Sequence, residues 1–189
     1  MTESKPQNLA IRVASDPTLL KLLIKLKEPQ YRIPIEYEEE IKKLRGISLA
    51  DKGVLVSKVT TPEDYQDQLK LLSAVQNCLD HIHELNLNLY IIQSRYKEMF
   101  NLATRIITLG YFDELNELKD GVRKVVVQVA LQPIQEGIDR LETLVTLGES
   151  TNKHLTAINF NIKEGTTIIR DYLSLFKFGS SVRVPTDEL

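Results

Sequence analysis

At 189 residues, the chain has the length of one domain, or of one domain with arms. Its hydrophobic fraction of 42% allows a real core, and the lack of tryptophan with only 8 glycines argues against a turn-rich β-sandwich. Residues 1–60 carry +3 (11 Lys/Arg against 8 Asp/Glu) and residues 61–189 carry −5 (13 against 18), which gives the net charge of −2. Neither part has the concentrated basic face with which nucleic-acid-binding domains contact phosphates, so nucleic acid is a weakly supported partner.

Targeting signals are not evident. The first residues, MTESKPQNLA, are polar, and no apolar run approaches the roughly 18–20 residues that span a bilayer. The single cysteine, Cys78, suits a reducing compartment. We therefore expect a protein that is not secreted through a signal peptide and that resides in the cytoplasm or in a particle assembled inside the cell.

The first sixty residues are predicted to form an arm of short helices and extended pieces. DPTLLKLLIKLKEP predicts a short helix with Asp16 as its N-cap, Pro17 in its first turn and a stop before Pro29. PIEYEEEIKKLRG predicts a second short helix, and GVLVSKV a small extended piece. We assign residues 1–60 to this arm.

The stretch LLKLLIKLK, residues 19–27, is amphipathic. Its leucines share one face and its lysines lie elsewhere, which is typical of a helix on an anionic membrane or of a helix that docks on protein. About ten residues are short for membrane adsorption, so protein docking is the favoured reading and a membrane is an unlikely partner. The predicted contact residues are Leu19, Leu22, Leu23 and Leu26.

A long helix is predicted to start at Pro62, with Thr61 as cap and Glu63 and Asp64 at the positive end of the helix dipole. Its apolar positions return every three or four residues up to Gly110, which marks the stop. At 1.5 Å per residue this helix has a length of roughly 70 Å. Its predicted inner stripe is Tyr65, Leu69, Leu72, Val75, Leu79, Ile82, Leu85, Leu89, Ile92, Tyr96, Met99, Ala103 and Ile106.

The connector LGYFDELNELKDG, residues 109–121, is bracketed by Gly110 and Gly121 and has room for a short helical turn. It therefore predicts the tip of an antiparallel hairpin. Tyr111 and Phe112 either form a binding tip or close the end of the bundle; the second reading is favoured, and both remain candidate interaction residues.

A second long helix is predicted from about Val122 to Gly179, with an inner stripe of Val125, Val129, Ile134, Ile138, Leu141, Val145, Leu155, Ile158, Ile162, Ile169, Leu173 and Phe176. Pro133 predicts a kink near Val129 or Ala130. Gly148 leaves open a break that would give three helices, although the stripe keeps its phase across it. Phe176 and Phe178 complete the candidate interaction residues. Residues 61–179 form the predicted hairpin, and 180–189 an extended tail.

Catalytic and metal motifs are weak. In DHIHE, residues 80–84, the two histidines are two positions apart and point in different directions on a helix, and no H-E-x-x-H pattern is present. His154 and Cys78 lack the neighbours that would activate them. We expect no catalytic residue, metal or cofactor, and a non-enzymatic protein.

The sequence thus predicts an all-α fold whose apolar faces are too wide for one partner helix, and whose asparagines at 86, 88, 101, 152, 159 and 161 lie on or beside the seam. The favoured function is a structural subunit of a symmetric homo-oligomer, as in a virion or similar particle, with other protein subunits as further partners. The alternatives are a nucleic-acid accessory protein of replication or recombination, and a membrane-associated helical scaffold.

Overall fold

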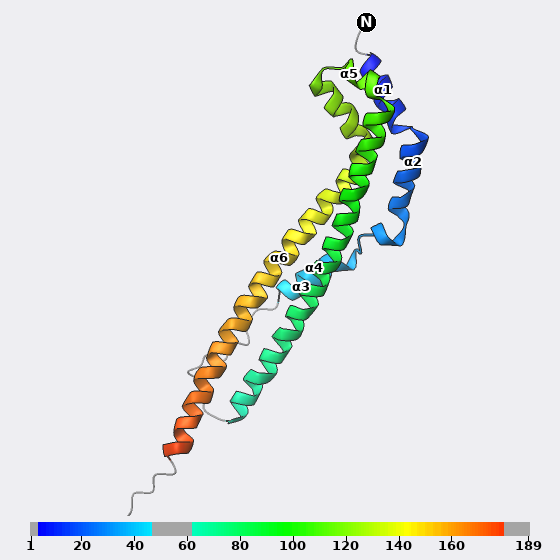
Figure 1. Cartoon of the computed structure of the whole chain (residues 1–189). Helices are drawn as coiled ribbons and strands as arrows, with labels where there is room; N and C mark the ends of the chain where they lie inside the picture. The colour runs from blue at the N-terminus through cyan, green and yellow to red at the C-terminus, as the bar shows by residue number, and fades with distance from the viewer. Residues whose placement is uncertain (1–3, 47–61, 180–189) are drawn as a thin grey trace, which may run out of the picture. The chain divides into compact units, whose positions relative to one another are not determined.

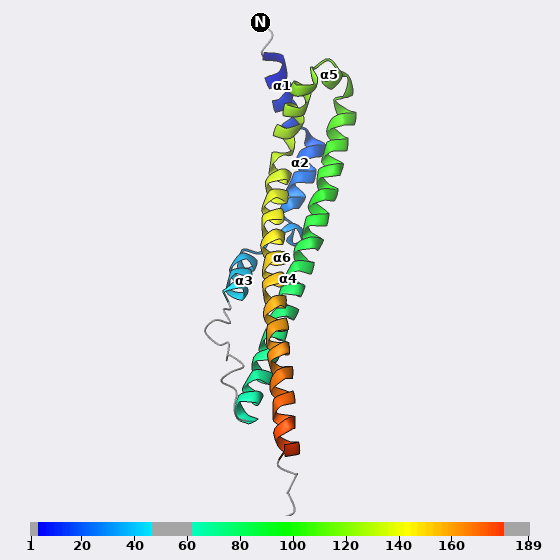
Figure 2. The same cartoon turned by 90° about the vertical axis from the view of Figure 1, so that its left-hand side faces the viewer.

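The computed structural model describes residues 4–46 and 62–179, and all elements within these ranges are helical. In chain order they are α1 (Ser4–Ala14), α2 (Pro17–Ile24), two 3-10 turns η1 (Lys25–Lys27) and η2 (Pro29–Tyr31), α3 (Glu36–Arg45), α4 (Pro62–Gly110), α5 (Phe112–Asn116) and α6 (Asp120–Gly179). The helices α4 and α6 pack as an antiparallel hairpin joined by α5 (Figure 1 and Figure 2). The all-α hairpin predicted from periodicity is confirmed.

The inner face of α4 follows the predicted stripe closely. Its buried side chains include Val75, Leu79, Ile82, Leu85, Leu89, Tyr96, Met99 and Ala103. Near the tip, the fully buried residue is Ile107, and Ile106 is only half-buried. The seam therefore drifts by one position there, as expected when a helix of 3.6 residues per turn follows a partner over many turns.

The helix α6 is continuous over 60 residues, so the alternative of a break at Gly148 is wrong. Pro133 lies inside it, and the path of α6 changes direction in its first turns, where the colour passes from green to yellow in Figure 1. The pyrrolidine ring removes one backbone N–H and clashes with the carbonyl of Val129, which bends a helix without ending it.

The first turns of α6 correct the predicted stripe. Val125 and Val129 are exposed, and Val126 and Ala130 are buried in their place. Beyond the proline the predicted positions hold, since Ile134, Ile138, Leu141 and Val145 are all buried. The bend at Pro133 shifts the rotational phase of the helix, which a uniform period cannot anticipate.

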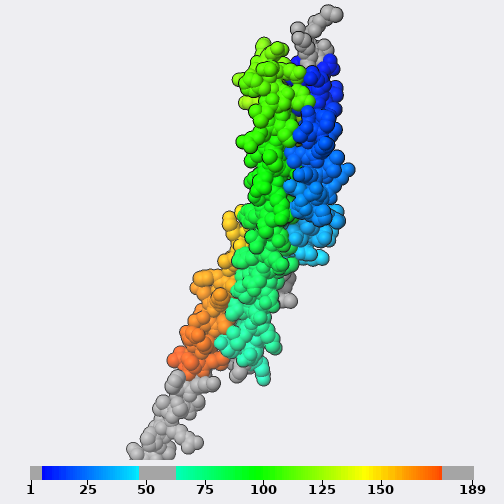
Figure 3. Space-filling view, turned by 45° about the vertical axis from the view of Figure 1, so that its right-hand side comes forward, coloured from blue at the N-terminus to red at the C-terminus, as the bar shows by residue number. Residues whose placement is uncertain are grey.

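The chain forms two compact units: Met1–Glu38 with Leu85–Leu147, and Glu39–Glu84 with Gly148–Leu189. In the first, the N-terminal helices pack along the hairpin segments, as the blue and green surfaces in Figure 3 show. Helix α1 was not expected from the sequence; its Leu9 and Val13, one turn apart, are buried. The helix predicted after Asp16 is confirmed, with its last turn tightened into η1.

The second unit combines α3 from Glu39 onward with the segments of α4 and α6 that belong to it. Ile41 and Leu44 of α3 are buried, and Nε2 of His81 lies 3.3 Å from Oε2 of Glu40. Asn159 is buried, and its Nδ2 donates to Oε1 of Gln76 across the seam at 3.4 Å.

The predicted asparagines divide between seam and solvent. Asn86 and Asn159 are buried, whereas Asn101 and Asn161 are exposed. The N-cap at Thr61, the extended piece GVLVSKV and the tail 180–189 lie outside the described residues.

Candidate interaction site

The hairpin tip holds the N-terminal arm through two polar contacts. The hydroxyl of Tyr111 donates to Oδ2 of Asp16 at 3.0 Å, and Nη2 of Arg12 donates to Oε1 of Glu114 at 3.1 Å. Behind them, Leu115 of α5 is buried. Tyr111 thus joins the arm to the end of the hairpin, which no local sequence pattern signals because the partners are 95 residues apart.

Asp16 has two roles at this corner. Its Oδ1 caps α2 by accepting from the backbone N–H of Thr18 at 2.7 Å and of Leu19 at 3.0 Å. The bond from Leu19 above all, with those from Tyr111 and Thr18, lowers the pKa of Asp16 against the opposing effect of desolvation. Burial, followed by the bond to Asp16, raises the pKa of Tyr111.

The leucines predicted to make contacts in α2 and η1 face the body of the first unit. Leu19 is fully buried, and Leu22, Leu23 and Leu26 are half-buried. Lower in the arm, Nη1 of Arg95 donates to the carbonyl oxygen of Gln30 at 3.0 Å. The inner face of α2 is therefore occupied by the protein's own hairpin.

A different face of α2 is exposed. Leu20 is 43% exposed and Ile24, one turn later, 61% exposed, and Lys21 and Lys25 beside them are exposed too. We call these four residues, of which Lys25 is the first of η1, the outer face of α2. Within the described residues, neither lysine forms an ion pair. The sequence pattern pointed to the leucines of the inner face and missed this one.

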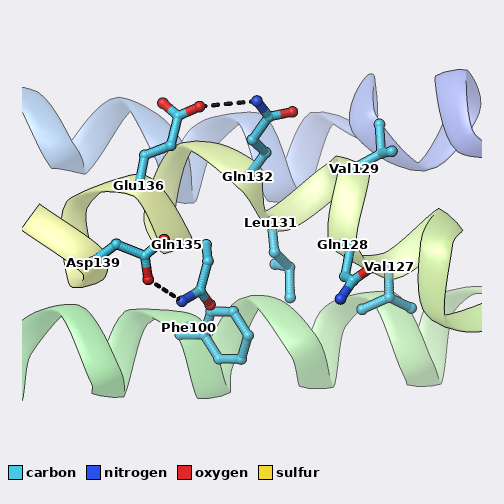
Figure 4. A pocket seen from close by; sticks show the side chains of 9 residues that line it. All are labelled: Phe100, Val127, Gln128, Val129, Leu131, Gln132, Gln135, Glu136 and Asp139. Carbon is cyan, nitrogen blue, oxygen red and sulfur yellow. Dashed lines mark hydrogen bonds between the residues drawn. The ribbon is translucent and has the colours of Figure 1, made fainter.

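A pocket of about 440 Å³ lies in the first unit beside the bend of α6 (Figure 4). We call it the Pro133 pocket. Its apolar wall consists of Phe100 from α4 with Val127, Val129 and Leu131 from α6, and its polar rim of Gln128, Gln132, Gln135, Glu136 and Asp139.

The position of the pocket follows from the bend. At about 100° per residue, Pro133 lies almost opposite Gln135 on α6, so a helix that opens on the proline side becomes concave on the side of Gln135. The rim is held by two bonds along the helix: Nε2 of Gln132 to Oε1 of Glu136 at 2.8 Å, and Nε2 of Gln135 to Oδ1 of Asp139 at 2.7 Å (Figure 4). In the described residues, neither carboxylate forms an ion pair.

The remaining predicted contact residues are not gathered at one place. Phe112 is 60% exposed at the hairpin tip, next to Tyr111, whose hydroxyl bonds to Asp16. Phe176 and Phe178 belong to the last turn of α6, where side chains are not described. Sequence reasoning did not single out the residues of the Pro133 pocket, although Pro133 followed by Gln135, Glu136 and Asp139 is a usable signal of a bend with a polar rim.

Exposed apolar residues recur on one outer face of each long helix, apart from the seam, with charged residues such as Glu98 and Glu164 between them. On α4 in the first unit they are Leu87, Ile91, Leu102 and Leu109, and on α6 in the second unit Phe160, Ile168 and Leu175. Their spacings of four, seven, eight and eleven keep each set on one helical face.

Among the residues that the structure describes, no group of three or more His, Cys, Asp or Glu side chains is arranged to hold a metal ion. No helix there combines the length and apolarity required to cross a membrane. Comparison with known proteins found no matching family model, no matching curated protein and no matching solved structure.

Proposed function

We propose that this chain is a non-enzymatic structural subunit that assembles with copies of itself, and with other protein subunits, into a symmetric particle such as a virion component. The observation that carries the proposal is the set of exposed apolar residues that recur on one outer face of each long helix, Leu87, Ile91, Leu102 and Leu109 on α4 and Phe160, Ile168 and Leu175 on α6. Exposed apolar residues that recur on one face of a helix favour a contact with another protein surface.

Copies of the same chain are the simplest cover, because most soluble oligomers are homo-oligomers with closed symmetry. The buried asparagines at the seam, Asn86 and Asn159, support a subunit whose register is fixed before it assembles. We place the assembly inside the cell, which the single cysteine suits.

Light scattering coupled to size-exclusion chromatography tests the proposal on the full chain at micromolar concentration. A defined oligomer is expected, and Phe160→Ser with Ile168→Ser should weaken it, whereas Asn161→Ser on the same helix should not. A well-behaved monomer at all concentrations would overturn the proposal.

A nucleic-acid accessory function is the second candidate, and the exposed lysines at 21, 25 and 27 favour it. Three phosphate contacts predict that binding to single-stranded DNA weakens with salt, with a slope of about −2 in a double-logarithmic plot. Absence of salt-sensitive binding would remove this candidate. The same lysines beside Leu20 and Ile24 are what support the membrane-associated alternative, which flotation with anionic liposomes tests.

A further inference from the structure

The outer face of α2 and the Pro133 pocket are complementary in chemistry. The first presents Leu20 and Ile24 beside two lysines, and the second an apolar wall with two carboxylates at one end (Figure 4). Resting on the proposed self-assembly, we propose that the outer face of α2 of one copy occupies the Pro133 pocket of a second copy.

The charges agree in spacing as well as in sign. Lys21 on α2 and Lys25 at the start of η1 are four positions apart, and Glu136 and Asp139 are three positions apart on α6. Gln132 and Gln135 each bond to one carboxylate oxygen of these acids, Oε1 of Glu136 and Oδ1 of Asp139. The other oxygen of each acid can then accept from an ammonium group at that end of the pocket, beside the apolar contact.

The chain's own α2 does not fill this pocket. Within the first unit, the blue N-terminal helix lies behind α6, above it in the close view of the pocket, and α4 lies below (Figure 4). Leu19 and its neighbouring leucines hold α2 in that place. The two complementary surfaces of one copy therefore lie on different sides of α6.

A contact between two different surfaces is heterologous, so each copy that donates its α2 keeps an open pocket for the next. Such a contact repeats until a ring closes, or continues as a filament. This gives the proposed assembly a head-to-tail interface with named residues on both sides.

Charge reversal in the full chain tests the contact by sedimentation velocity. Lys21→Glu with Lys25→Glu, and separately Glu136→Lys with Asp139→Lys, should each weaken assembly by about tenfold or more, since like charges then face each other. Combining all four substitutions restores opposite charges and should recover assembly. Recovery also shows that the single-surface variants did not fail by misfolding, and circular dichroism on each variant checks helix content directly.

Lys153→Glu with Lys163→Glu is the matched control, because both lysines are exposed on α6 in the second unit, whereas the pocket belongs to the first. It should leave assembly unchanged. Mixing the two single-surface variants should restore assembly with alternating copies, because the native α2 of one meets the native pocket of the other, and the reversed α2 then meets the reversed pocket.

The outcomes separate the two proposals. If both charge-reversed variants assemble as well as the wild type, the proposed α2 contact is wrong, and self-assembly through another surface remains. If reversing the charges of the pocket abolishes assembly but reversing those of α2 does not, the pocket binds another occupant, such as a basic segment of a different protein. This result also overturns the α2 contact. A monomeric wild type overturns the proposed function itself.

Discussion

Tyr96 of α4 packs directly on Gly137 of α6. A Cβ built on Gly137 would overlap Cε1 of the Tyr96 ring and lie 2.8 Å from Cδ1. On its other side the ring meets Tyr31 of the arm edge-on, with centroids 6.0 Å apart and an interplanar angle of 75°. One buried ring thus joins the arm, α4 and α6 of the first unit.

Gly137→Ala should destabilise the protein by about 1–3 kcal/mol, because the added methyl group has to displace a buried ring. This loss outweighs the roughly 1 kcal/mol by which alanine is the better helix former. Gly121→Ala is the control, since its Cβ would meet nothing within 4 Å. Urea unfolding followed by circular dichroism measures both. Equal or greater stability of Gly137→Ala would show that the ring has room to move.

Tyr111→Phe removes the hydroxyl that donates to Asp16 and should lower the free energy of unfolding by about 1 kcal/mol. Hydrogen exchange at the backbone amides of α2 should also speed up, because the hydroxyl joins the start of that helix to the hairpin tip. Tyr31→Phe is the control, as no hydrogen bond of the Tyr31 hydroxyl is found in the described residues. If the two variants behave alike, the hydrogen bond from Tyr111 to Asp16 does not contribute to stability.

The low pKa of Asp16 predicts a pH dependence of stability. Because the pKa in the folded state lies below the ordinary value of 3.8, the contribution is complete above that value. It is lost as the pH falls through the folded-state pKa. Asp16→Asn keeps a capping oxygen and should flatten the fall in stability below about pH 4. Unfolding titrations at several pH values measure the difference; identical slopes for both proteins would contradict this account.

Leu19→Ala should cost about 2–5 kcal/mol, because the side chain is fully buried where α2 meets the first unit. Leu20→Ala removes the same atoms from the outer face and should change stability by about 0.5 kcal/mol or less. Thermal unfolding of the two variants compares these faces directly. Similar losses would mean that α2 does not pack through its Leu19 face.

Asn159→Leu should leave stability unchanged or raise it by about 1 kcal/mol, because the amide is buried while its Oδ1 accepts no hydrogen bond from the described residues. Asn161→Leu, on an exposed position two residues later, should not stabilise. If Asn159→Leu destabilises strongly, the bond from its Nδ2 to Gln76 is worth more than the burial of the amide costs. Chemical denaturation decides between these results.

Much of the fold was predictable because its signals are local. Each signal acts within one or two turns of a helix. The signals are the N-cap at Asp16, the positions of glycine and proline, and the apolar residues that recur every three or four positions from Val75 to Ala103. The prediction that Val125 and Val129 are buried was wrong because the bend at Pro133 changes which side of α6 faces the seam. Helix α1 was missed because its buried apolar residues, Leu9 and Val13, span only one turn.

The candidate contact surfaces could not be predicted from the sequence in the same way. Sequence reasoning chose the leucines at 19, 22, 23 and 26, which the protein's own hairpin covers in full or in part. Which side of an amphipathic helix is left over depends on what the other side packs against, and that partner is far away in the chain.

The amino-acid sequence by itself determined the two long helices, the helix after Asp16 and the hairpin, since hydrogen bonds and side-chain periodicity within a helix involve residues at most a few positions apart. Only the tertiary structure decided that Tyr111 holds Asp16, that Tyr96 sits on Gly137, and that Leu20 and Ile24 remain exposed while Leu19 does not. These contacts link residues 40 or more positions apart, or follow from contacts that do. The free energy that stabilises them comes from tertiary packing, which a short stretch of sequence does not reveal.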